Sequence, residues 1–87
     1  MTTVKLKAFY NESGVMLSDE DIQRNLMLLP DLLKHMLEEG DKAEFTKQDY
    51  KSKQVEIAIT ASCEKDKLEK IIKVALKNSN LVGTLIC

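Results

Sequence analysis

The amino-acid sequence predicts an α+β domain in which two helices cover one antiparallel sheet. Three observations lead to this prediction. Four short segments read as strands, two of them with clear alternation of apolar and polar residues, and apolar residues recur every three or four positions in two longer segments, as in amphipathic helices. The segments follow one another as strand, helix, strand, strand, helix, strand. The chain has 87 residues, so we expect residues 1–87 to form a single domain.

Residues 3–10 are the first predicted strand. Their side chains alternate between an apolar face and a face that carries two lysines and one ring, which is typical of a half-buried strand. The apolar face is expected to hold Val4, Leu6 and Ala8. Asn11 to Gly14, with the sequence NESG, has the composition of a turn and should end this strand.

The first helix is expected to begin at Ser18 and to end before Gly40. Ser18 can accept a hydrogen bond from the backbone of Asp21, as an N-cap residue does. Gly40 has the residue type that commonly follows the last turn of a helix. A stripe of apolar residues at helical spacing should face the sheet, and it consists of Ile22, Leu26, Leu29, Leu33 and Met36.

Pro30 lies in the middle of the most apolar run, Asn25 to Leu37. A proline in a helix interior removes one backbone hydrogen bond and costs about 3 kcal/mol. The apolar stripe keeps its phase across Pro30, which favours a single helix with a kink. In the alternative, Pro30 occupies the first position of a second helix, where proline is common.

The second half of the chain predicts two strands, a helix and a last strand. Residues 43–51 form a weaker strand with Phe45 as its main apolar anchor, and residues 51–54 form a turn. Residues 55–61 show the clearest alternation in the chain. The second helix should begin at Ser62 or Cys63 and end between Asn78 and Asn80. Residues 81–87, LVGTLIC, form a strand that is apolar on both faces.

This order of elements in 87 residues resembles the ferredoxin-like βαββαβ plait. The resemblance covers the whole chain but concerns only the order of the elements. It implies a four-stranded antiparallel sheet in the order 4-1-3-2, with both helices on one face. This fold carries many unrelated functions, so the resemblance predicts none by itself.

The residues that other families with this plait use for function are missing. A metal chaperone would carry two cysteines in the loop after the first strand, and that loop has none. An RNA-recognition module would place aromatic rings on the central strands, where Phe9 is alone. An acylphosphatase would need an arginine in the first loop to hold phosphate. The single arginine, Arg24, lies inside the first predicted helix.

We predict no catalytic residue, no cofactor and no metal site. His35, the only histidine, should lie on the outer side of the first helix without the orienting partner that acid–base catalysis needs. Cys63 and Cys87 are too few for a disulfide scaffold and fit no zinc motif, so we expect two free thiols and a cytoplasmic protein. No apolar run approaches the ~20 residues needed to cross a membrane. The formal net charge of −1 argues against general binding to nucleic acid.

The chain has more apolar residues than one core needs, which predicts a protein interface. Part of the excess lies on the flank of the first helix. Another part lies on the sheet face that two helices on the opposite side leave uncovered. The candidate interface residues are Phe9, Met27, Leu28, Leu32, Ala58, Val82, Thr84 and Ile86.

We therefore expect a non-enzymatic protein–protein interaction module. Its first partner should be a second copy of itself, with contact through the last strand, and it would act as a small regulator or inhibitor of a larger assembly. The alternative is a small-ligand sensor similar to ACT domains, with Asn11, Ser13 and Gly14 in the ligand loop. A small hydrolase or a nucleic-acid contact module comes third.

Overall fold

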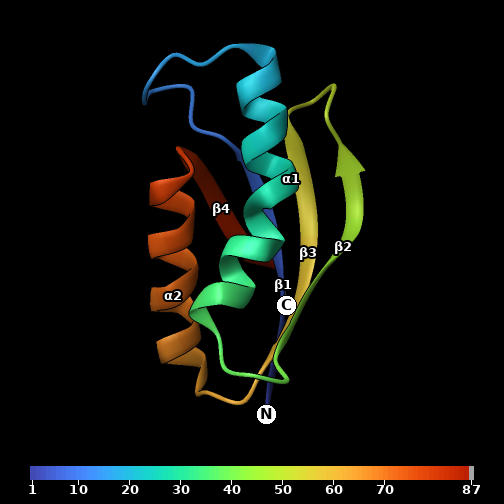
Figure 1. Ribbon diagram of the computed structural model, residues 1–87, viewed down its shortest axis with the longest axis vertical. Coiled ribbons are helices and arrows are strands. Elements are labelled where there is room, and N and C mark those ends of the chain that lie inside the picture. The colour runs from blue at the N-terminus through green and yellow to red at the C-terminus, as the bar shows by residue number, and fades with distance from the viewer. Residues whose placement is uncertain (87) are drawn as a thin grey trace.

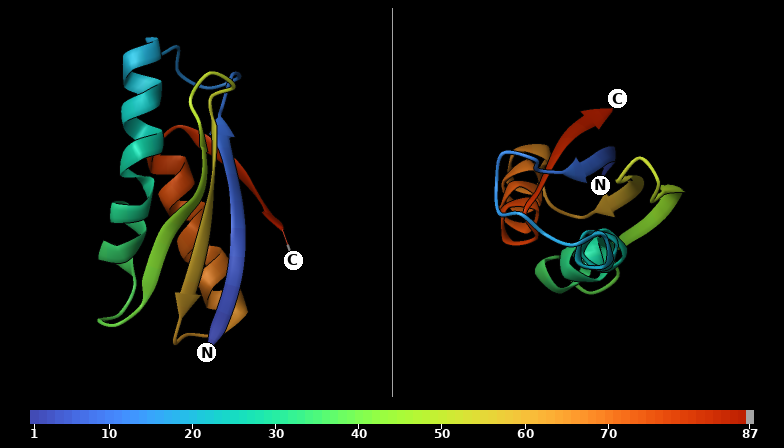
Figure 2. Two further views of the ribbon diagram at one scale, coloured as in Figure 1. Left: turned by 90° about the vertical axis from the view of Figure 1, so that its right-hand side faces the viewer. Right: turned by 90° about the horizontal axis from the view of Figure 1, so that it is seen from above.

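The computed structural model describes residues 1–86 and confirms the ferredoxin-like plait. The four strands form one antiparallel sheet in the order β2-β3-β1-β4, which is 4-1-3-2 from the other edge. Both helices lie on one face of this sheet (Figures 1 and 2). The elements are β1 (Thr2–Tyr10), α1 (Asp19–Met36), β2 (Lys42–Asp49), β3 (Gln54–Ala61), α2 (Lys65–Asn78) and β4 (Leu81–Ile86).

The core lies between the sheet and the two helices. The predicted stripe of α1 faces it: four of its members are buried, and Met36 is half-buried at the rim. The inward side chains of the two central strands complete the core, because every second residue of a strand points to the same face. The largest fully buried side chains are Leu6, Leu26, Leu29, Leu33, Val55, Ile57, Ile59 and Leu68.

Pro30 lies inside a single helix. α1 is continuous from Asp19 to Met36, so the alternative of a second helix beginning at Pro30 is wrong. Figure 1 shows that the ribbon of α1 changes direction about halfway, and that its later turns lie closer to α2. Pro30 itself is buried, so the burial of its apolar ring offsets part of the free energy lost with the missing hydrogen bond.

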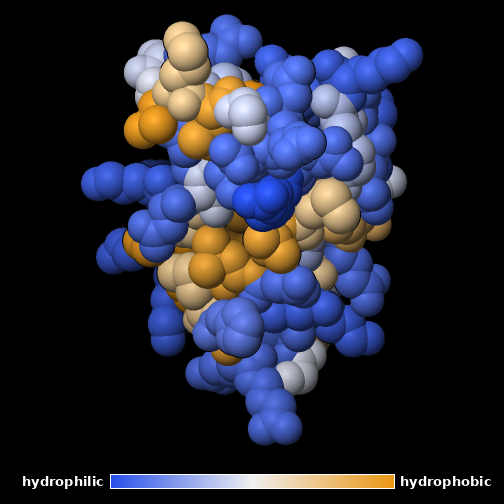
Figure 3. Space-filling model, turned by 45° about the horizontal axis from the view of Figure 1, so that its top comes forward, coloured by the Kyte–Doolittle hydropathy of each residue, from blue (hydrophilic) through white to orange (hydrophobic). Residues whose placement is uncertain are grey.

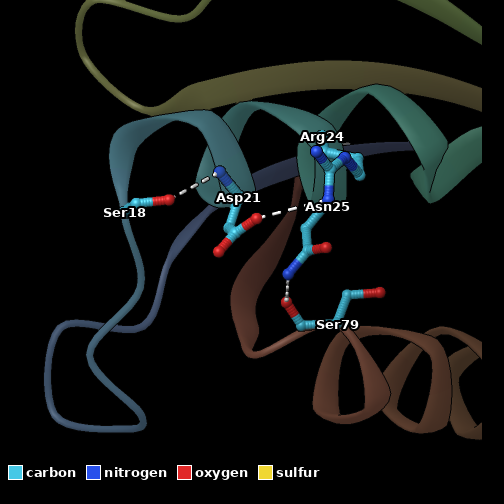
Figure 4. A network of polar contacts seen from close by, with 5 residues as sticks. All are labelled: Ser18, Asp21, Arg24, Asn25 and Ser79. Atoms are coloured by element: carbon cyan, nitrogen blue, oxygen red, sulfur yellow. Dashed lines mark hydrogen bonds and ion pairs between the residues drawn. The ribbon is translucent and has the colours of Figure 1, made fainter.

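The start of α1 was predicted correctly and its end was not. The Ser18 hydroxyl accepts a hydrogen bond from the Asp21 N–H at 3.2 Å (Figure 4). The helix ends at Met36, and Leu37 is its C-cap, so the last turn comes earlier than expected from Gly40. The reason is a separate turn after the helix, in which the Asp41 N–H donates to the Glu38 carbonyl at 3.0 Å. Gly40 supplies the positive φ of 93° within that turn.

The predicted start of α2 was too early. Its N-cap is Glu64, which makes no side-chain capping bond, instead of Ser62 or Cys63. Ser62 is occupied elsewhere, because its N–H donates to Asp41 at 3.0 Å and its hydroxyl donates to Glu38 at 3.0 Å. A serine near a predicted helix start can therefore bond to a distant turn instead of its own helix.

The hairpin between β2 and β3 is shifted relative to the prediction. β2 ends at Asp49 instead of residue 51, and its register shifts between Phe45 and Lys47, as at a β-bulge. The turn comes earlier because the Asp49 carboxylate accepts the Ser52 N–H at 3.2 Å. Lys53 then takes a left-handed φ of 56°. The last residue of the final predicted strand, Cys87, lies outside the described residues.

Candidate interaction surface

β4 forms one outer edge of the sheet, so one side of its backbone faces no other strand of residues 1–86. Its side chains alternate as predicted. Leu81 is buried and Leu85 is half-buried against the core, whereas Val82 and Ile86 point outward with 39% and 37% of their surface exposed. The six residues LVGTLI include no charge and no proline. Figure 2 shows that the end of β4 projects beyond the rest of the sheet.

β2, the opposite edge, carries the features that usually prevent strand pairing. Its eight residues KAEFTKQD include two lysines and two acids, and the register shift after Phe45 interrupts its regular ladder. Charged side chains and bulges are the common means by which natural proteins block an edge strand. β4 has neither, so the two edges of this sheet differ in their capacity to accept another strand.

A groove runs between α2 and β4 beside the free edge. It holds about 370 Å³ and is lined by Leu6, Glu69, Ile72, Lys73, Leu76, Gly83, Thr84 and Leu85. Glu69 and Lys73 are one helical turn apart and carry opposite charges, so their contributions to the charge of the groove cancel. The rest of the lining is largely apolar. The groove therefore has the chemistry to receive an apolar side chain.

Gly83 allows α2 to pack closely on β4. A Cβ built at this residue would lie 2.8 Å from Leu6 Cδ1 and 2.9 Å from Leu76 Cδ1. Both distances are shorter than a carbon–carbon contact allows, so a larger residue here would force the Leu6 and Leu76 side chains to move. Gly83 therefore preserves the shape of the groove.

The uncovered sheet face is only partly apolar. Phe9 lies beside Val82, and both point outward at one end of the β1–β4 pair. Ala58 lies between Lys5 and Glu44, and Lys7 lies between Glu56 and Thr84. The outer face thus combines an apolar margin along β4 with charges of both signs at its centre, which makes the margin the better contact.

A second apolar area lies on the helices. Met27 and Leu28 on α1 are 50% and 51% exposed, and Leu32 is half-buried. In Figure 3, hydrophobic atoms gather in the middle of the helical face and again near the top of the view. Leu28 and Leu32 border a hollow of about 440 Å³ whose other wall is the end of α2. The three helical residues of the predicted interface are therefore on a different face from the edge of β4.

α1 is tied to the end of α2 by one polar contact. The Asn25 amide donates at 3.0 Å to the carbonyl of Ser79, the C-cap residue of α2 (Figure 4). Arg24, the residue before Asn25, pairs with Asp21 at 3.3 Å on the exposed side of α1. Asn25 satisfies a carbonyl at a helix end, where intrahelical donors are lacking. This contact fixes the wall of the hollow beside Leu28.

Four exposed large apolar residues were not among the predicted interface residues, and the first of them is Met1, which is 96% exposed. Val15 and Met16, before α1, are 66% and 92% exposed, and Val74 on α2 is 48% exposed. Val74 could have been found from the sequence, because it lies outside the stripe of α2 that packs on the sheet. Val15 and Met16 lie in a segment without periodicity, so no pattern in the sequence indicated which way they point.

The predicted ligand loop is held by its own hydrogen bonds. The side-chain oxygen of Asn11 accepts two hydrogen bonds from Ser13, one from the Ser13 N–H at 3.2 Å and one from the Ser13 hydroxyl at 2.8 Å. The Gly14 N–H donates to the Asn11 carbonyl at 3.1 Å. Asn80, before β4, donates through its side chain to the Val15 carbonyl at 3.0 Å. The loop is thus a folded turn fastened to the start of β4.

This loop borders a hollow of about 460 Å³ at the end of the sheet. Its walls combine the ring of Phe9 with polar groups from two turns, and the lining consists of Phe9, Tyr10, Asn11, Glu12, Ser13, Ser52, Lys53, Gln54 and Val82. The Lys53 ammonium lies 3.6 Å from Asp19 and 5.8 Å from the centre of the Tyr10 ring. Aromatic residues and Lys53 thus line the same hollow, and the Lys53 ammonium is itself paired with Asp19.

The surroundings of Asp49 and Tyr50 shift the pKa of each side chain. Hydrogen bonds from Ser52, above all from its backbone and then from its side chain, lower the pKa of Asp49. These bonds belong to the turn between β2 and β3. Burial raises the pKa of Tyr50. His35 is exposed, as predicted. No cluster of three or more His, Cys, Asp or Glu suitable for a metal ion occurs in the described part of the chain.

Comparisons with known proteins give no family. No model of a known protein family matches the chain, and no curated protein is similar enough to be a relative. Within residues 1–86, neither helix has the length and apolar character needed to cross a bilayer. A function for this chain must therefore be argued from its fold and the chemistry of its surface.

Proposed function

We propose that this chain is a non-enzymatic protein–protein interaction module that forms a homodimer through the free edge of β4. One observation carries the proposal: the edge is exposed, has neither charge nor proline, and lies beside an apolar groove. An unprotected edge is a ready template for another strand. The charged and bulged β2 supports the same choice of edge.

A second copy is the partner that this edge fits best. Two identical strands related by a two-fold axis run antiparallel, so each supplies the donors and acceptors that the other lacks. Pairing would join two four-stranded sheets into one sheet of eight strands, with β2 at both outer ends. The charged edges would then be the only ones left exposed, so assembly would stop at the dimer.

The homodimer would serve as a small regulator or inhibitor of a larger assembly in the cytoplasm. The helical face remains free in such a dimer, because it lies away from the β4 edge. Its exposed residues Met27, Leu28 and Val74 form the area available to a larger protein. The small number of cysteines supports a reducing compartment.

The test compares two matched lysine substitutions on the outer sheet face. Thr84→Lys places a charge on β4, and Thr60→Lys places the same charge on the interior strand β3. Sedimentation velocity at tens of micromolar should give a dimer for the native chain and for Thr60→Lys. In the dimer, the two lysines introduced by Thr84→Lys, one in each copy, would be held about 8 Å apart. Their repulsion costs about 1–2 kcal/mol at a protein surface, so Thr84→Lys should weaken the dimer about ten-fold. A native chain with a mass near 9.9 kDa would contradict the proposal.

A second candidate function is recognition of a small ligand by the hollow beside Asn11, Ser13 and Gly14. The observation that favours it is that Phe9 and Lys53 line one hollow of about 460 Å³. A free amino acid has the carboxylate for Lys53 and a side chain for Phe9. Titration of a panel of amino acids, followed by NMR shifts of the amides of residues 9–14, tests this. Equal shifts in Lys53→Ala and in the native chain would contradict it.

A further inference from the structure

The backbone N–H and C=O groups of successive β4 residues point alternately toward β1 and toward the open edge. Two hydrogen bonds show which residues point in which direction. The Tyr10 N–H donates to the Lys53 carbonyl at 3.1 Å, so the backbone of Tyr10 faces β3. The Asn11 N–H donates to the Asn80 carbonyl at 3.2 Å, on the side of β4. Residues 80 and 11 are opposite each other in the continued β1–β4 register, which pairs Leu81 with Tyr10.

It follows that every second residue of β4 presents its N–H and C=O to the open edge. In an antiparallel pair, opposite residues alternate between bonding each other and pointing away. Residues 80, 82, 84 and 86 therefore face β1. The residues that face the open edge are Leu81, Gly83 and Leu85, and each of them offers one donor and one acceptor.

We propose that two copies pair through β4 in one register, in which Gly83 lies opposite Gly83 of the second copy. This inference rests on the proposed homodimer and adds its register. Leu81 then lies opposite Leu85 of the second copy, and Leu85 opposite its Leu81. All the edge-facing residues of each copy meet edge-facing residues of the other. Every edge-facing donor and acceptor of the two strands is then used in a hydrogen bond.

Within residues 81–86, the neighbouring two-fold registers use fewer of these groups. If Val82 lies on the axis, Leu81 meets Gly83 of the second copy, and Leu85 extends beyond the end of the partner strand. If Thr84 lies on the axis, Gly83 meets Leu85 of the second copy, so two edge-facing residues of each copy are paired within residues 81–86 instead of three. Each of these registers leaves one edge-facing residue per copy without a strand partner within β4. An unpaired backbone group loses the contribution of its hydrogen bond.

The side chains agree with the register centred on Gly83. On the helical side, Leu85 is half-buried in the single copy and would pack beside Leu81 of the second copy, at the mouth of the groove. The two glycines on the axis add no side chain, so α2 of each copy keeps its close contact with β4. On the outer side, Val82 would lie beside Thr84 of the second copy. No charged residue of β4 enters the contact.

Disulfide trapping tests the register. Cys63 and Cys87 are first replaced by serine, and Val82→Cys and Thr84→Cys are made separately in that background. Both side chains point outward, and residues opposite each other in a non-hydrogen-bonded pair have Cα atoms about 4.5 Å apart, within disulfide range. A mild oxidant is added to each variant alone and to an equimolar mixture. Thr60→Cys mixed with Val82→Cys is the control for random collision.

The mixture of Val82→Cys and Thr84→Cys should form cross-linked dimers about ten-fold or more faster than either variant alone or the control, because paired thiols have effective concentrations in the millimolar range. Faster cross-linking of Val82→Cys alone or Thr84→Cys alone would overturn the register and leave the edge-paired homodimer standing. A dimeric mass without cross-links in any sample would overturn edge pairing. A monomeric mass at tens of micromolar would instead remove the proposed function itself.

Discussion

Replacing Gly14 by alanine should destabilise the fold, because Asn80 occupies the space that a Cβ would need. A Cβ built at Gly14 would overlap the side-chain oxygen of Asn80. That oxygen accepts the Val15 N–H at 3.3 Å, and the Asn80 nitrogen donates to the Val15 carbonyl at 3.0 Å. Asn80 would have to give up this pair of bonds to make room. The segment before α1 would then lose its attachment to the start of β4.

The two bonds set the size of the effect. A hydrogen bond contributes about 0.5–1.5 kcal/mol net, so losing two costs about 1–3 kcal/mol. Both bonds are at the surface, which favours the lower part of this range, about 1–2 kcal/mol. In a domain of this length, such a loss lowers the Tm by about 5–15 °C. Chemical denaturation followed by circular dichroism resolves a change of this size.

A double-mutant cycle tests the stated cause. Asn80→Gly removes the side chain and keeps the left-handed φ of 54°, which glycine adopts without strain. Once the Asn80 side chain is absent, Gly14→Ala meets no obstacle on that side. The double variant should therefore be about as stable as Asn80→Gly alone. Fully additive losses from Gly14→Ala and Asn80→Gly would refute the reasoning.

Burial, thiol chemistry and charge give three more predictions. Leu33→Ala should cost ~2–5 kcal/mol by thermal or urea denaturation, because Leu33 is fully buried, whereas Leu28→Ala at a half-exposed site should cost under about 1 kcal/mol; equal losses would show that the core is misassigned. A thiol reagent under denaturing, non-reducing conditions should find two free thiols per chain, and none would exclude reduced cysteines. The lowered pKa of Asp49 means that its contribution to stability is full above the ordinary value of 3.8 and is lost as the pH falls through the lower folded value. Asp49→Asn should therefore flatten the loss of stability below about pH 4, and parallel curves for the two proteins would contradict this.

The periodicity of apolar residues was enough to predict the fold. Alternation in β1 and β3 and the stripe of α1 each specify one buried face, and the six elements follow in the order of a plait. The continuity of α1 through Pro30 was also favoured by the stripe, because Leu26, Leu29 and Leu33 stay in phase. These features depend on local spacing, which the sequence contains directly.

The element ends that were wrong depend on contacts between distant residues. Ser62 does not cap α2 because Asp41 and Glu38, from the turn after α1, accept its hydrogen bonds. Gly40 does not follow the last turn of α1 because a turn between Glu38 and Asp41 needs it. Capping rules consider only neighbours in sequence, so they cannot anticipate these partners.

The candidate surface was predicted in part for the same reason. The sequence indicated that β4 is apolar on both faces, and the topology then placed it at an edge. The groove beside it could not be predicted, because it arises from the close approach of Leu76 and Leu6 to Gly83. The exposure of Val15 and Met16 depends equally on how Asn80 and Tyr10 hold their segment.

Hydrogen exchange at the backbone of β4 tests edge pairing most directly. The amides of Val82, Thr84 and Ile86 face β1, so they should be protected at every protein concentration. The amides of Leu81, Gly83 and Leu85 face the open edge, so they should exchange freely in dilute protein and become protected as the concentration rises into the dimer range. NMR of the native chain resolves the two sets. Free exchange of Leu81, Gly83 and Leu85 at all concentrations, with Val82 and Thr84 protected, would contradict the edge-paired homodimer.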